Sequence, residues 1–75
     1  MKMAEFEVRS EMSGIVRKIE AQPGSHIESE GTLLILECMK MEIPVLVPKG
    51  GRVKALLVEE GATVEEGQKL AVLES

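Results

Sequence analysis

Residues 14–27 read GIVRKIEAQPGSHI and residues 51–64 read GRVKALLVEEGATV, and these two stretches decide the fold. Each begins with Gly, carries Val two residues later and has a second Gly ten residues after the first. The same shift of 37 positions lays residues 5–38 over residues 42–75 without a gap, and nine of the aligned pairs are identical. Because Gly and apolar positions determine the course of the backbone, this internal repeat predicts two halves with the same structure.

Each half contains four short runs rich in Val, Ile and Leu, separated by Gly and Pro, which is typical of β-strands. The runs are Glu5–Ser10, Ile15–Ala21, the surroundings of Ile27, and Leu33–Glu37 in the first half, and Glu42–Val47, Arg52–Val58, the surroundings of Val64, and Leu70–Glu74 in the second. No segment spaces its apolar residues at the helical positions i, i+3, i+4 and i+7, so we expect no helix.

About eight strands in a single sheet would leave one apolar face in water, and two packed sheets avoid this. The predicted fold class is all-β. We expect a flattened β-barrel or sandwich of two four-stranded antiparallel sheets, related by pseudo-two-fold symmetry through the internal repeat (a barrel-sandwich hybrid). The link at residues 38–42 and the two chain ends should then lie at opposite ends of the molecule.

Length and composition limit the function classes. The chain of 75 residues is expected to form one domain, residues 1–75, either as a complete protein or as part of a longer chain. Its net charge of −4 and its single aromatic residue, Phe6, exclude nucleic-acid binding. No apolar run approaches the roughly 20 residues that cross a bilayer, and no signal peptide is recognisable. With Cys38 as the only cysteine, we expect a cytoplasmic location without membrane insertion.

The link between the two halves departs from ordinary turn chemistry. Tight turns favour Gly, Asn, Asp, Ser and Pro, whereas Met39 and Met41 here flank Lys40. A local rule broken without structural gain often marks function, and Met adapts to irregular partner surfaces. The alternative is that Met39 or Met41 folds into the core and Lys40 is an ordinary solvated charge. The repeat opposes this alternative, because the counterparts of Lys40 and Met41 are Met3 and Ala4, so the lysine belongs to one half only.

The run Glu37–Glu42, which reads ECMKME, resembles the attachment motif of the biotinyl/lipoyl attachment domain family, usually written Ala-Met-Lys-Met. The resemblance covers nearly the whole chain, including the Gly14 strand start, the turn at Pro23-Gly24 and the segment from Gly61 to Gly67. It implies that Lys40 carries covalent biotin and that Met39 and Met41 are recognised by the modifying enzyme. The inserted "thumb" of the bacterial acetyl-CoA carboxylase carrier is absent. The chain looks more like the thumbless carriers or the stand-alone biotin/lipoyl attachment proteins.

Two positions depart from the family pattern. Cys38 stands where the family usually has Ala, which places a thiol beside the lysine. Glu30 stands where Gly is usual, and Gly31 follows one residue later than Gly67 predicts, so we expect that turn to bulge differently.

The function implied by the resemblance is that of a biotin carboxyl carrier. A biotin protein ligase would make biotinyl-adenylate from ATP and transfer it to Lys40. A free lysine has a reference pKa of about 10.4, so the ligase must supply the base. The carrier would then serve a biotin carboxylase and a carboxyltransferase. No residue of this chain need be catalytic, and it would be a non-enzymatic carrier.

Two other functions remain open at this point. Lipoate could be carried on the same lysine, although lipoyl domains usually show Asp-Lys before Ala at the tip, so Met39 and Met41 favour biotin. An unmodified β-sandwich adaptor could instead bind a partner through the hairpin of Met39-Lys40-Met41. A small enzyme is disfavoured, because so short a chain is not expected to build a deep cleft and shows no catalytic constellation.

Other chemically active groups carry weaker signals. His26 has no second His or Cys near it in sequence to build a metal site, and Cys38 has no evident base. The paired carboxylates Glu59-Glu60 and Glu65-Glu66 flank turns and are read as solvated charges. Gly50-Gly51 is followed by no helix, so it is not a phosphate loop. We predict no metal site.

Overall fold

The computed structural model describes residues 4–75, which form eight β-strands and no helix, and so contain no helix able to cross a membrane. The strands are β1 (Glu5–Arg9), β2 (Gly14–Ile19), β3 (His26–Ile27), β4 (Thr32–Cys38), β5 (Met41–Leu46), β6 (Gly51–Leu56), β7 (Thr63–Val64) and β8 (Lys69–Glu74). The predicted all-β class is confirmed, and the second run of each half ends two residues earlier than predicted. Met3, the counterpart of Lys40 in the repeat, lies outside the described residues.

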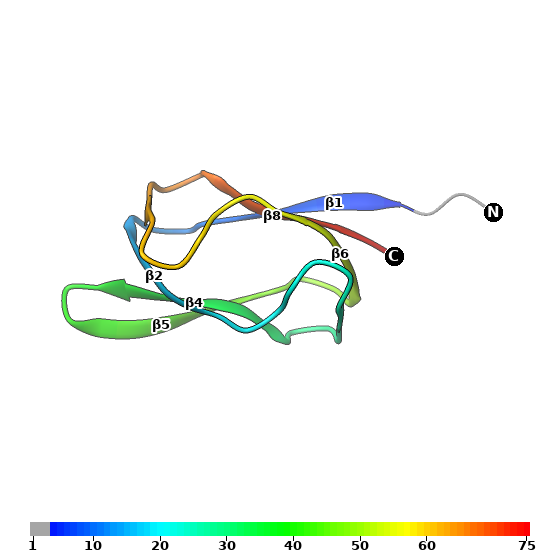
Figure 1. Cartoon of the computed structure of the whole chain (residues 1–75), viewed down its shortest axis with the longest axis horizontal. Coiled ribbons are helices and arrows are strands. Elements are labelled where there is room, and N and C mark those ends of the chain that lie inside the picture. The colour runs from blue at the N-terminus through cyan, green and yellow to red at the C-terminus, as the bar shows by residue number, and fades with distance from the viewer. Residues whose placement is uncertain (1–3) are drawn as a thin grey trace.

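The strands form two four-stranded antiparallel sheets, with the orders β1-β8-β6-β3 and β5-β4-β2-β7. Each sheet takes two strands from each half, because β2 pairs with β7 and β3 pairs with β6. Figure 1 shows the β4–β5 hairpin at one end of the long axis, and the beginning of β1 with the end of β8 at the other. At that other end, Ala4 and Ser75 exchange two backbone hydrogen bonds of 3.1 and 2.9 Å. The predicted pseudo-two-fold arrangement is therefore present in the strand pairing.

The two halves share even their irregularities. The register shifts at Arg17 in β2 and at the equivalent Lys54 in β6. It shifts again at Leu33 in β4 and at the equivalent Leu70 in β8. A bulge inserts one residue and breaks the strict in–out alternation of a strand. This explains why β4 and β8 each bury two consecutive apolar residues, Leu33-Leu34 in the first case.

The core consists almost entirely of aliphatic side chains from both sheets. Its fully buried members are Leu33, Leu34, Leu36, Leu70, Leu73, Val16, Val47, Val53 and Val64. Two glycines allow strands to approach closely beside this core. A Cβ on Gly14 would lie 2.8 Å from the carbonyl oxygen of Glu37, and one on Gly51 would lie 2.6 Å from that of Glu74. The repeated Gly that begins the second strand of each half is thus required by space.

The turn before β4 corrects one expectation from the sequence. Glu30 has φ of 65°, and Gly67 in the equivalent turn has φ of 85°. Both turns close with the same hydrogen bond, from Gly31 N–H to the Glu28 carbonyl (2.8 Å) and from Gln68 N–H to the Glu65 carbonyl (3.0 Å). The turn does not bulge differently. Glu30 adopts the left-handed conformation that Gly provides in the other half, at a cost of roughly 1–2 kcal/mol for a residue with a Cβ.

Replacing Glu30 by Gly should therefore stabilise the protein. Relief of left-handed strain exceeds the entropic cost of Gly, roughly 0.5–1 kcal/mol, so we expect a net gain of about 0.5–1 kcal/mol in the free energy of unfolding. Denaturant-induced unfolding would measure it. In the equivalent turn, Gly67→Ala should lose about 1 kcal/mol. A destabilised Glu30→Gly variant would contradict this account of the turn.

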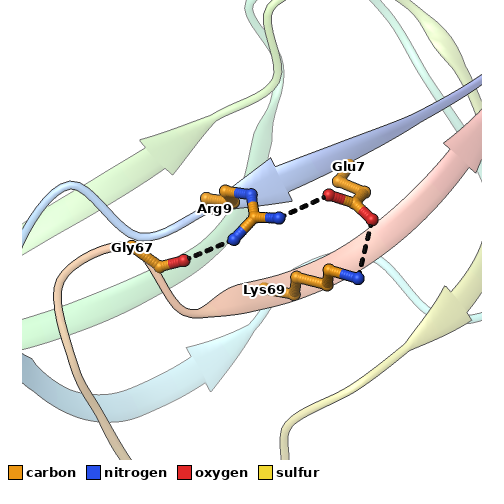
Figure 2. A network of polar contacts seen from close by, with 4 residues as sticks. All are labelled: Glu7, Arg9, Gly67 and Lys69. Atoms are coloured by element: carbon orange, nitrogen blue, oxygen red, sulfur yellow. Dashed lines mark hydrogen bonds and ion pairs between the residues drawn. The ribbon is translucent and has the colours of Figure 1, made fainter.

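A small charge network holds β1 to β8 at the sheet edge (Figure 2). The Arg9 guanidinium donates to the Gly67 carbonyl (2.8 Å) and to the Glu7 carboxylate (2.9 Å). The Lys69 ammonium lies 2.9 Å from the other Glu7 oxygen. The Lys69 hydrogen bond and, to a lesser extent, that of Arg9 lower the pKa of Glu7 below its ordinary value of 4.5, although desolvation opposes them.

This shift predicts a pH-dependent contribution to stability. A carboxyl whose pKa is lowered by folding stabilises the fold above its unfolded pKa, and this stabilisation is lost as the pH falls through the folded value. The difference in unfolding free energy between wild type and Glu7→Gln should be largest near neutral pH and should shrink below about pH 4. Glu66→Gln, which removes an exposed carboxylate outside this network, is the control. A difference between wild type and Glu7→Gln that stays constant from pH 7 to pH 3 would contradict the assignment.

Candidate functional site

The candidate site is the tip of the β4–β5 hairpin. Met39 and Lys40 alone connect the two strands, and both have positive φ values, of 52° and 67°. Two left-handed central residues are what a type I′ hairpin turn requires, and Asn-Gly is its usual sequence. Here two residues with long side chains hold that conformation, each at a cost of roughly 1–2 kcal/mol. The turn therefore presents large side chains where the backbone alone would favour small ones.

The side chains at the tip face solvent. Met39 is 90% exposed and Met41 is 61% exposed, so the alternative that either folds into the core is wrong. Lys40 is exposed as well, and its ammonium makes no hydrogen bond or ion pair within residues 4–75. The three residues that the sequence singled out thus lie together at one end of the molecule, with the lysine between two exposed thioether side chains.

The strand that follows the tip is protected against pairing with another chain. β5 is the edge strand of its sheet, and Pro44 stands in it opposite Ile35 of β4. Proline has no amide hydrogen to offer, which blunts an exposed edge without disturbing the paired side. The hairpin can therefore project from the sandwich without recruiting a further strand.

A pocket of about 220 Å³ lies along β5, lined by residues that include Met12, Leu36, Ile43 and Val45. Its lining does not reach the tip residues. Small-molecule sites usually enclose roughly 300–1,000 Å³, so this hollow is small for a substrate. At the equivalent position in the other half, Phe6 stands in place of Ile43 and packs against the core. The Lys49 ammonium lies 5.1 Å from the centre of the Phe6 ring.

The remaining candidate groups have structural surroundings. Within residues 4–75, no three His, Cys or acidic side chains are grouped so as to hold a metal ion. Cys38 is half-buried and lies opposite Met41 in the hairpin. Glu60 accepts a hydrogen bond from the Ile19 amide at 3.0 Å, a role that its place in a charged pair did not reveal.

A charged cluster just below the tip of the hairpin was missed in the sequence. Glu37 and Glu42 lie directly opposite each other, and the Nε of Arg17 lies 3.4 Å from the first carboxylate and 4.0 Å from the second. A signal for it existed, because all three positions recur with the same charge in the repeat, as Glu74, Glu5 and Lys54.

Comparison with known proteins gives the same assignment. The family model for biotin-requiring enzymes matches residues 18–73. The biotin/lipoyl attachment protein of Bacillus subtilis is 39% identical over 66 residues, which cover 88% of this chain and 90% of that protein. A biotinylated protein TB7.3 homolog of Mycobacterium leprae is 38% identical over 71 residues, covering 95% of this chain and 99% of that one.

A solved structure extends the likeness to three dimensions. The urea carboxylase of Kluyveromyces lactis contains a region that superposes on 97% of this chain with a TM-score of 0.87 and 33% sequence identity. This region is only 6% of the urea carboxylase chain. Fold, motif and family match agree, and this chain belongs to the biotin-requiring enzyme family.

Proposed function

We propose that this chain is a biotin carboxyl carrier and that biotin is attached to the Nζ atom of Lys40. The observation that carries the proposal is the position of Lys40, exposed in a two-residue turn with no partner for its ammonium within residues 4–75. A primary amine at this place can enter the active site of another enzyme without disturbing the core. The chemistry of the side chain fits the group, because a lysine amine and the carboxyl of biotin form a stable amide.

Attachment is an acyl transfer to nitrogen. A biotin protein ligase presents an acyl group activated as an adenylate, and its base takes a proton from Lys40. The freed Nζ attacks the acyl carbon, a C–N bond forms, and the C–O bond to the adenylate breaks, so that AMP leaves. The nitrogen then gives up a second proton to a base of the ligase or to water, which leaves a neutral amide. The side chain loses its positive charge in the process. Met39 and Met41 provide the apolar contacts that distinguish this lysine from the others in the chain.

The chain's own contribution after attachment is mechanical. When bound, biotin supplies the group that carries an activated carboxyl unit. The sandwich supplies a stiff base, and the hairpin places the attachment point at its far end, which raises the effective concentration of the cofactor at partner sites. The likeness to a small part of urea carboxylase supports partners of the carboxylase class, with a biotin carboxylase and a carboxyltransferase as the two sites visited. We propose no catalytic residue in this chain.

Intact mass measures the proposal directly. Incubation with biotin, ATP and a biotin protein ligase should add one biotinyl group to the wild type and none to Lys40→Arg. Lys18→Arg, which removes another exposed amine, should still gain one group. A folded wild type that gains no mass would overturn the biotin assignment. A gain with lipoate and a lipoyl ligase instead would identify the other acyl group, and no gain with either would favour the adaptor.

Met39→Ala and Met41→Ala should each lower the ligase kcat/KM by roughly tenfold, because burying a Met side chain against a partner contributes about 1.5 kcal/mol. Their stability should change little, because both side chains are exposed. Leu46→Ala removes another exposed apolar side chain, at the end of β5 that lies far from the tip, and this variant should be modified at the wild-type rate. Equal rates for all three variants would show that the flanking residues are not recognised.

A further inference from the structure

Two like-charged side chains lie opposite each other in the hairpin, immediately below its tip. Cys38 pairs with Met41 next to the turn, and the following pair is Glu37 with Glu42. In an antiparallel hairpin closed by a two-residue turn, this second pair is of the type that lacks mutual hydrogen bonds, and its side chains lie closest. Like charges directly opposite each other destabilise strand pairing by up to about 1 kcal/mol. The two carboxylates therefore favour opening of the strands where the turn is already strained.

One residue offsets this repulsion. Arg17 has no partner in the β2–β4 register, because β2 bulges there. Its guanidinium lies within ion-pair distance of carboxylates on both strands of the hairpin. Its Nε is 3.4 Å from Glu37 and 4.0 Å from Glu42, so a single cation faces both carboxylates and contacts both strands of the hairpin. Exposed ion pairs are individually weak, about 0–1 kcal/mol. This energy is comparable with the repulsion that Arg17 offsets.

The other half of the molecule contains a related cluster at a different place. Glu5 and Glu74 are directly opposite partners, but here two cations pair with them: Lys54, the bulged residue of β6, with Glu5, and Arg52 with Glu74. The hydrogen bond that Lys54 donates to the Glu5 carboxylate, with a smaller contribution from the charge of Glu74, raises the pKa of Lys54. This second cluster lies beside the two chain ends, where no turn connects the strands. Lys54 thus provides a matched control for Arg17.

The tip has little else to keep it closed. Met39 and Lys40 both adopt a left-handed conformation, which costs free energy. The exposed side chains of Met39 and Met41 contribute no packing against the core. Local opening free energies in proteins extend down to nearly zero at such places. When the closed and open forms are nearly balanced, a small stabilisation changes the closed fraction measurably, and apparent affinity for a partner follows that fraction.

We propose that Arg17 is a positioning residue for modification of this chain, which closes the hairpin by neutralising the Glu37–Glu42 pair and so holds Met39, Lys40 and Met41 in the arrangement that a ligase binds. The inference rests on the proposed attachment of biotin to Lys40. In this proposal Arg17 sets the fraction of molecules in which the hairpin is closed and Lys40 can be bound. The ligase alone carries out the chemistry at Nζ.

Arg17→Ala should raise amide hydrogen exchange at Cys38 and Met41 about threefold and should raise the ligase KM by up to the same factor with kcat unchanged. Arg17→Lys should behave like the wild type, because Lys54 fills the equivalent position in the other half. Lys54→Ala should change neither hairpin exchange nor KM. The proposal would be overturned if Arg17→Ala left both the amide hydrogen exchange of the hairpin and the ligase KM unchanged. It would also be overturned if Lys54→Ala changed them as much as Arg17→Ala does.

A second background separates relief of repulsion from any direct contact of Arg17 with the ligase. In Glu42→Gln the like-charge pair no longer exists, so adding Arg17→Ala should leave KM and exchange unchanged. A persistent rise in KM in that background would mean that Arg17 itself touches the ligase, against the proposal. Failure of wild type to be biotinylated would sink the proposed function instead, whereas the exchange measurements need no ligase.

Discussion

Neither half of this chain can bury its own apolar residues, and this constraint governs the rest of the structure. β2 of the first half needs β7 of the second, and β6 of the second half needs β3 of the first. The core is therefore shared, with Val16 and Val53 buried to the same 1% exposure at equivalent positions. A domain of this size buries a smaller fraction of its surface than a larger domain does. Interleaving the two halves is how a 75-residue chain, with no aromatic side chain among its fully buried residues, forms a single core.

The repeat explains why so much of the fold was predictable. Eight strands, two sheets and the opposite placement of the hairpin and chain ends all follow from aligning the halves and alternating apolar residues. The prediction for the turn at Glu30 was wrong, because a Glu in place of the usual Gly was taken to mean a different backbone conformation. There, the backbone hydrogen bonds from Glu30 to Val47 and from Gly31 to Glu28 hold the turn and offset the left-handed cost of a Cβ.

The exposed tip was predictable for a different reason. Met39, Lys40 and Met41 violate turn preferences, and the violation located the site before its geometry was known. The cluster of Arg17 with its two carboxylates could not be derived in the same way, because a bulge changes which face a residue occupies. Sequence spacing along an ideal strand does not reveal that displacement.

The elongated outline has a mechanical consequence. The molecule measures 43 Å along its longest axis and 18 Å across, with the lysine hairpin at one end and the paired Ala4 and Ser75 at the other. A segment joined to the chain near Ala4 or Ser75 would attach to it at the end opposite the hairpin. A small rotation of the domain about that attachment point would displace the tip over a large distance, without bending either sheet. The distance that the cofactor travels would then depend chiefly on the pivot, while the sandwich transmits the motion as a stiff rod.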